Sequence, residues 1–177
     1  MRLRVMVELE TYGGDAVSDW IDKLKKNEQS QLSEKNSQDE MRLHKAKIIR
    51  SKMPAFLEML KERVEADCNK LRAEFPTNKH RDCFVTGVRP DRFTIKGGGL
   101  PQRNLDLELN VDGLCVGIFE SEILDRGQPA IQTKGNREIG IEVDEEEQLQ
   151  FRFRGKLHRD IESLSEHLVS YVARIQE

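Results

Sequence analysis

The sequence has few aromatic residues and no long apolar run. Aromatics make up 6% of its 177 residues, so stacking platforms for bases or sugars are not expected to be abundant. No run of about 18 or more apolar residues occurs, which excludes a membrane-spanning helix. The segment Met1 to Glu10 also lacks the apolar core and cleavage site of a secretory signal. These absences predict a soluble protein located in the cytoplasm, with no membrane partner.

A basic excess is also missing. The chain has 29 Lys and Arg against 32 Asp and Glu, for a net charge of −3, so it lacks the general electrostatic attraction that draws proteins to nucleic-acid backbones. Basic residues do cluster between Arg42 and Lys52. Acidic residues follow in the same segment and no aromatic interleaves with the basic ones, which favours a solvated charged face. Nucleic acid is therefore not expected as a partner.

Cysteine and histidine are too scarce and too scattered to predict a metal site. The three cysteines, Cys68, Cys83 and Cys115, are an odd number without short metal-type spacing, which argues for a reducing compartment and against a disulfide framework. His80 and Cys83 are close in sequence, but zinc needs further ligands and no second close pair supplies them. We expect no metal and no cofactor.

Two short motifs look like catalytic fingerprints without the elements that would give them meaning. Gly97-Gly98-Gly99 is followed by Leu-Pro and a strand pattern, whereas a phosphate loop needs a helix N-terminus after its glycines. His158-Arg159-Asp160 has the letters of a kinase catalytic loop, but the glycine-rich loop and strand lysine are absent. We interpret the first as a flexible turn and the second as the start of the last helix, and predict no catalytic residue.

Residues 1–40 are predicted to form a strand, a short helix and a polar linker. Apolar and polar residues alternate from Arg2 to Glu10, which is typical of a half-buried strand. Only Leu32 is apolar from Asn27 to Glu40. No Pro or Gly forbids a helix there, but such a segment cannot bury enough surface to offset its ordering entropy. A flexible connection is favoured, with an exposed helix as the alternative.

Residues 41–76 are predicted to form a long amphipathic helix. Its apolar residues recur at steps of three and four, so they form one stripe. Pro54 lies inside the pattern, so the helix either begins near Ser51 or kinks there, and Pro76 ends it. An unbroken helix would be longer than a small domain is wide, so part of it would need a partner. The candidate contacts with a second copy are Ile49, Met53, Leu57, Leu60, Val64 and Leu71.

Residues 77–177 are predicted to form an antiparallel sheet of about six strands with a C-terminal helix. The clearest strand alternates from Leu105 to Val111, and Asp112-Gly113 after it is a strong hairpin turn. A second helical stripe runs from Ile161 to Ile175. The class is therefore α+β, with the sheet packed against the long N-terminal helical segment and the C-terminal helix. We expect residues 41–177 to form one domain.

Two functions are compatible with this organisation. The first is a non-enzymatic protein–protein interaction or assembly module, which forms a homo-oligomer, in the simplest case a dimer, through its long helix. The second is a small-ligand-binding domain, enzymatic or not, with a cavity between the sheet and a helix. The candidate pocket residues are Phe93, Leu107, Phe151 and Phe153.

Overall fold

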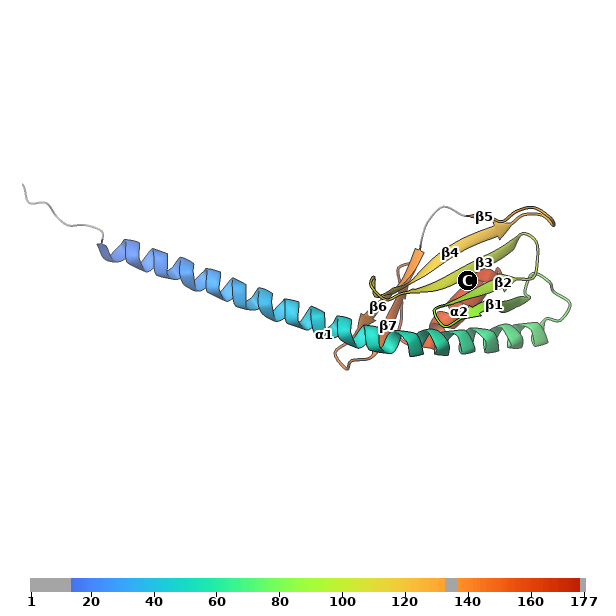
Figure 1. The fold of residues 1–177 in the computed structure, drawn as a ribbon, viewed down its shortest axis with the longest axis horizontal. Coiled ribbons are helices and arrows are strands. Elements are labelled where there is room, and N and C mark those ends of the chain that lie inside the picture. Colours follow the sequence, from blue (N-terminus) through green and yellow to red (C-terminus); the bar gives the residue numbers. More distant parts are fainter. Residues whose placement is uncertain (1–13, 133–136, 176–177) are drawn as a thin grey trace, which may run out of the picture. The chain divides into compact units, whose positions relative to one another are not determined.

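A computed structural model describes residues 14–132 and 137–175, and the predicted strand in residues 2–10 lies outside this part of the chain. The chain divides into two compact units, residues 1–43 and 44–177. Helix α1 spans Gly14–Glu74, and the second unit also holds helix α2 and the strands (Figure 1). No helix in the described part of the chain is both long and apolar enough to cross a membrane.

Residues 27–40 are helical, where a flexible connection was favoured. The segment consists of Glu, Gln, Lys, Leu, Ser, Asn and Asp, several of them strong helix formers, and none of them breaks a helix. Pro54 also lies within α1 and does not end it. The helix ends at Glu74, close to Pro76, because the residue before a proline is driven out of the helical region.

In the described part of the second unit, the strands form one antiparallel sheet of eight strands. The strand order is β1-β2-β3-β4-β6-β7-β8, and β5 pairs with β4 beside this path. The α+β class is confirmed, and two strands are added to the expected six because β5 and β8, at two and three residues, are too short to show alternation. The strands are β1 (Cys83–Arg89), β2 (Arg92–Gly97), β3 (Gln102–Asn110), β4 (Cys115–Ile123), β5 (Ile131–Gln132), β6 (Arg137–Val143), β7 (Leu149–Phe153) and β8 (Lys156–His158).

The turns between strands follow the sequence signals. The predicted hairpin joins β3 to β4, and the Gly113 N–H donates to Asn110 Oδ1 over 2.9 Å. Gly98 and Gly99 lie in the turn between β2 and β3, where a Cβ atom would come within 2.7 Å of Asp82 and of His80, respectively. The glycines therefore allow two chain segments to approach closely, and the reading of this motif as a turn is confirmed.

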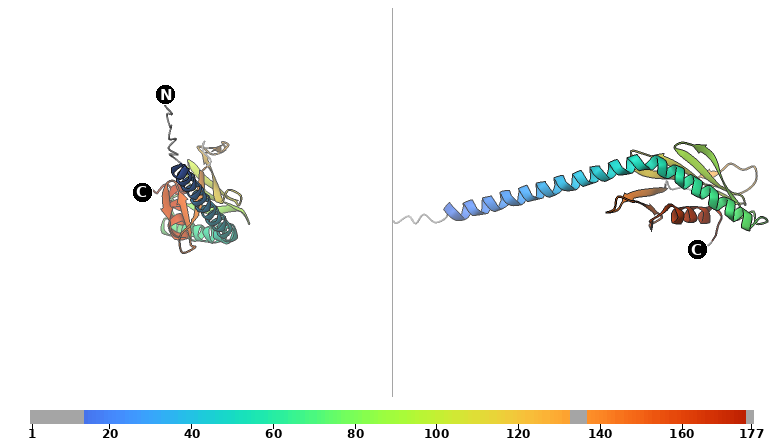
Figure 2. Two further views of the ribbon diagram at one scale, coloured as in Figure 1. Left: turned by 90° about the vertical axis from the view of Figure 1, so that its left-hand side faces the viewer. Right: turned by 90° about the horizontal axis from the view of Figure 1, so that it is seen from below.

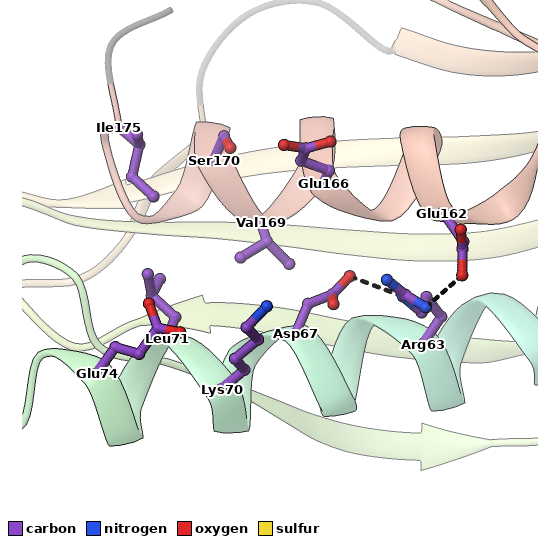
Figure 3. A pocket seen from close by; sticks show the side chains of 10 residues that line it. All are labelled: Arg63, Asp67, Lys70, Leu71, Glu74, Glu162, Glu166, Val169, Ser170 and Ile175. Atoms are coloured by element: carbon purple, nitrogen blue, oxygen red, sulfur yellow. Dashed lines mark hydrogen bonds and ion pairs between the residues drawn. The ribbon is translucent and has the colours of Figure 1, made fainter.

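Helix α2 (Ile161–Val172) lies beside α1 on the sheet, as Figures 2 and 3 show. Asp160 caps it, accepting a 2.7 Å hydrogen bond from the Ser163 N–H, as the position of this residue before the apolar stripe predicts. The Ser165 hydroxyl donates to Asp67 of α1 over 2.7 Å. These contacts fix α2 against the half of α1 that belongs to the second unit.

The hydrophobic core lies between the sheet and the two helices. The Phe56 ring of α1 stacks on the Phe151 ring of β7, with ring centroids 4.3 Å apart and planes 13° apart. Phe93 of β2 pairs in register with Leu107 of β3, and both side chains are buried. Alternate residues of the strands thus meet the apolar stripe of α1, and this burial holds the second unit together.

We predict that Phe56→Ala lowers the free energy of unfolding by about 3–5 kcal/mol, because it removes a buried ring and leaves a cavity. Urea denaturation followed by circular dichroism measures this loss. Met59→Ala is the matched control, because Met59 lies on the same helix but is exposed, and it should cost less than about 1 kcal/mol. Equal losses for the two variants would contradict this assignment of the core.

Candidate functional site

The six predicted oligomer contacts belong to the core of the chain itself. Ile49, Met53, Leu57, Leu60 and Val64 are buried against the sheet and α2, and Leu71 is half-buried against the same cluster. A side chain covered by its own chain has little apolar surface left for a second copy. The contact prediction at these positions is therefore replaced by an intramolecular role.

The four predicted pocket residues are also core residues. Phe93, Leu107, Phe151 and Phe153 are buried in the hydrophobic cluster. Of these four, Phe151 also lines an open groove of about 450 Å³, together with Phe56, Met59 and Ile161. This volume lies in the range of about 300–1,000 Å³ that small-molecule sites occupy. The groove opens at the edge of the core, and the other three predicted residues do not line it.

A second open groove, of about 460 Å³, runs between α1 and α2 (Figure 3). Its lining carries both signs of charge, and Arg63 of α1 pairs with Asp67 of the same helix (3.2 Å) and with Glu162 of α2 (2.6 Å). These ion pairs are partly exposed, so each contributes little to stability. The groove is therefore a polar contact region between two helices, and the residues described as lining it form no arrangement typical of a catalytic site.

Among the residues that the structure describes, Glu120 of β4 is the buried carboxylate, at 7% exposure. Its side chain accepts from Arg154 over 2.9 Å and from the Tyr171 hydroxyl over 2.8 Å, and Arg137 lies 3.2 Å away. The Arg154 guanidinium also stacks over the Tyr171 ring, 3.7 Å from its centroid. Glu120 therefore joins the strands to the end of α2. A buried carboxylate held by this many donors acts as a structural anchor.

Glu122, two residues further along β4, repeats this arrangement nearer the surface. Arg174 donates to it over 2.6 Å, and Arg103 lies 3.7 Å away. Arg103, Tyr171 and Arg174 also line a groove of about 340 Å³. Each of these two arginines already has a carboxylate partner. Their positive charges are therefore balanced within the protein, which disfavours the binding of an anion in this groove.

Three polar side chains form a row of hydrogen-bond contacts that connects the start and the middle of α2. His158 Nδ1 lies 2.9 Å from the Ser163 hydroxyl, and His158 Nε2 lies 3.1 Å from His167 Nδ1. Burial, together with the charges of His167 and Lys156, lowers the pKa of His158 against the opposing effects of Asp160 and Ser163. Sequence reasoning treated these histidines as scattered. Three such groups in a row can relay a proton. However, His158 is only 1% exposed, so a substrate cannot contact its side chain.

The first unit offers a different kind of surface. Six large apolar side chains between residues 20 and 43 are exposed, among them Leu32 (60%) and Leu43 (71%). Ile21, Leu32 and Leu43 are spaced by eleven residues, which is close to three helical turns, so they lie along one face. We call Ile21, Leu24, Leu32 and Leu43, with Trp20 at their edge, the N-terminal stripe. Met41 lies on the opposite face.

Within residues 14–132 and 137–175, no three His, Cys, Asp or Glu side chains are grouped so as to hold a metal ion. Cys68 and Cys83 lie with their sulfurs 2.8 Å apart in the core, but His80 does not join them in such a group. The charged clusters around Arg63, Glu120 and Glu122 in the second unit are paired internally. The N-terminal stripe is the surface that its own unit leaves uncovered, and it is our candidate functional site.

We predict that Glu120→Ala lowers the free energy of unfolding by about 2 kcal/mol, because Arg154 and Tyr171 lose a buried partner. Chemical denaturation measures the change. Glu142→Ala removes an exposed pair with Arg152 and should cost no more than about 1 kcal/mol. A Glu120→Ala loss no larger than that of the control would show that the cluster is not an anchor.

We also predict that acid weakens the fold through His158. Because its pKa is lower in the folded protein than the ordinary 6.5, the unfolded chain takes up the proton first as pH falls. The stabilisation is present above the unfolded pKa and is lost below it. Unfolding free energies measured between about pH 7.5 and 5.5 should decrease on acidification, and His158→Gln should flatten this dependence. An unchanged slope in the variant would refute the role of His158.

Comparison with protein families, curated proteins and solved structures found no match for this chain. No relative therefore supplies a substrate, a partner or a set of site residues. A function must therefore be inferred from the exposed and buried groups described above, and from the N-terminal stripe in particular.

Proposed function

We propose that the protein is a non-enzymatic assembly module that associates with further copies of itself through residues 20–43 of α1. The observation that carries the proposal is the exposure of the N-terminal stripe, in which Ile21, Leu24, Leu32 and Leu43 all face solvent. Exposed apolar side chains aligned on one helix face offer a contact surface to a partner helix. A second copy is the simplest partner, because it is present wherever the protein is.

The energetics of an isolated helix support the same proposal. Formation of a helix needs a costly nucleus, and in proteins most helical stability comes from packing of an apolar face. Residues 20–43 bury no side chain, so helix propensity alone must offset their ordering entropy. Pairing of the N-terminal stripe with another helix would supply the missing apolar burial and hold the segment in its helical form.

In this proposal, residues 20–43 of α1 link the folded second unit of one copy to a second copy. Its core is made by its own residues, including the face of α1 that was predicted to contact a second copy. The three cysteines are free and buried, which supports the inference that the protein works in the reducing cytoplasm.

We predict that the full chain has a mass in solution of about 41 kDa, twice the chain mass of 20.5 kDa, when it is analysed by light scattering at micromolar or higher concentration. The double variant Leu24→Ser/Leu32→Ser should dissociate at concentrations where the wild type is dimeric, since it removes apolar side chains from the paired face.

The matched control is Met41→Ser, which removes an exposed apolar side chain from the opposite face of the same segment. It should leave the mass unchanged. A monomeric wild type at every concentration tested, or an equal effect of the control and the double variant, would overturn the proposal.

A further inference from the structure

We infer that the partner of the N-terminal stripe is a second copy in antiparallel orientation, with the two-fold axis of the pair at Leu32. This inference rests on the proposed function and adds to it the direction and the register of pairing. It follows from the order of apolar and charged residues along residues 20–43, all of which are exposed.

Three apolar residues of the stripe are symmetric about Leu32, whereas Leu24 has no apolar counterpart on the other side. Ile21 precedes Leu32 by eleven residues and Leu43 follows it by eleven, which corresponds to about 16 Å of helix on either side. When two copies run in opposite directions with their Leu32 side chains in contact, Ile21 of each meets Leu43 of the other. An antiparallel pair thus forms three apolar layers from three positions per chain.

Two charged residues of the stripe face are antisymmetric about the same point. Lys25 and Asp39 are seven residues before and after Leu32, on the stripe face because each is four residues from an apolar member. Reversal of one helix therefore places Lys25 of each copy opposite Asp39 of the other. Glu28 is four residues before Leu32 and Lys35 is three residues after it, so in the antiparallel pair Glu28 of each copy lies one residue away from direct opposition to Lys35 of the other. Lys25 and Asp39 thus form two directly opposed pairs of opposite sign in the dimer.

A parallel pair in register gives the opposite result. Lys25 would meet Lys25, and Glu28, Lys35 and Asp39 would each meet their own kind, and like charges in contact oppose association. Three apolar layers form in both orientations and only Leu24 lacks an apolar counterpart in the antiparallel pair, so these layers do not decide between the two orientations. The charges do distinguish them, and they select the antiparallel one.

An intrachain contact competes only weakly with this arrangement. Asp39 lies 3.8 Å from Arg42 of its own chain, and their side chains are 54% and 80% exposed. Such exposed pairs contribute little, so the Asp39 carboxylate can accept Lys25 of a second copy without a large loss.

Charge reversal in the full chain tests the orientation. Lys25→Asp places the introduced carboxylate against Asp39 of the other copy, twice in each antiparallel dimer. We expect the dimer dissociation constant, measured by analytical ultracentrifugation at low salt, to rise about tenfold. Asp39→Lys should act similarly. The double variant Lys25→Asp/Asp39→Lys restores opposite charges and should return within about twofold of the wild type.

The matched control is Lys26→Asp, which makes the same charge change on the far side of the helix and should leave the dissociation constant unchanged. In a parallel dimer the double variant would keep like charges opposite each other and show no rescue. Absence of rescue in a protein that still dimerises overturns the antiparallel pairing and leaves the proposed function standing.

Disulfide trapping provides an independent readout. Two full-length chains of different tag length, one carrying Ile21→Cys and the other Leu43→Cys, are mixed and oxidised, with the wild type as background for the three buried native cysteines. The antiparallel pair predicts a cross-linked species of mixed length. Cross-linking of Ile21→Cys only to itself, in a dimeric sample, indicates the parallel pair and overturns the inference. A monomeric sample overturns the proposed function as well.

Discussion

The packing of α1 residues 49–71 against the sheet is the constraint on which the rest of the structure depends. Phe56 stacks on Phe151, and the neighbouring apolar side chains of the helix fill the same core as Phe93 and Leu107. This burial stabilises the second unit, and it also occupies the most strongly apolar face of the chain. Any contact with a partner must therefore be made elsewhere, and residues 20–43 carry apolar side chains that remain exposed.

Patterns with a short period predicted the fold well, whereas the helix at residues 27–40 was missed for an energetic reason. Alternation located the main strands, and the Asp112-Gly113 signal located the β3–β4 hairpin. Of the residues His158 to Asp160, which were expected to start the last helix, Asp160 caps it and His158 ends β8. Between the paired strands β6 and β7, Arg152 donates to Glu142 over 2.8 Å. For residues 27–40 the entropy argument favoured a flexible connection, but unbroken helix propensity and the lack of Pro or Gly outweigh it locally.

The polar clusters show where sequence reasoning reaches its limit. Glu120 is in phase with Val116 and Ile118 on β4, so its position on the core face was visible as a charged residue in an apolar alternation. Its partners were not visible, because Arg154 and Tyr171 lie 34 and 51 residues further along the chain. His158 and His167 likewise belong to different elements and meet because β8 leads directly into α2. Pairings of this kind are set by tertiary packing, and no local period encodes them.

The two halves of α1 differ in how densely their apolar residues are spaced. In residues 49–71 the apolar positions recur every three or four residues, which is dense enough to build a core. In residues 21–43 the main apolar layers recur only every eleven residues, with charges between them on the same face. A face so sparse in apolar groups cannot bury much surface, so the proposed association would be weak and reversible. The charges then decide which orientation forms, because they contribute to the difference between two arrangements whose apolar contacts are nearly equal. In such a helix the charged residues would set the direction of pairing, and a few apolar side chains would supply the attraction. This combination would suit an assembly that forms in one register and dissociates readily.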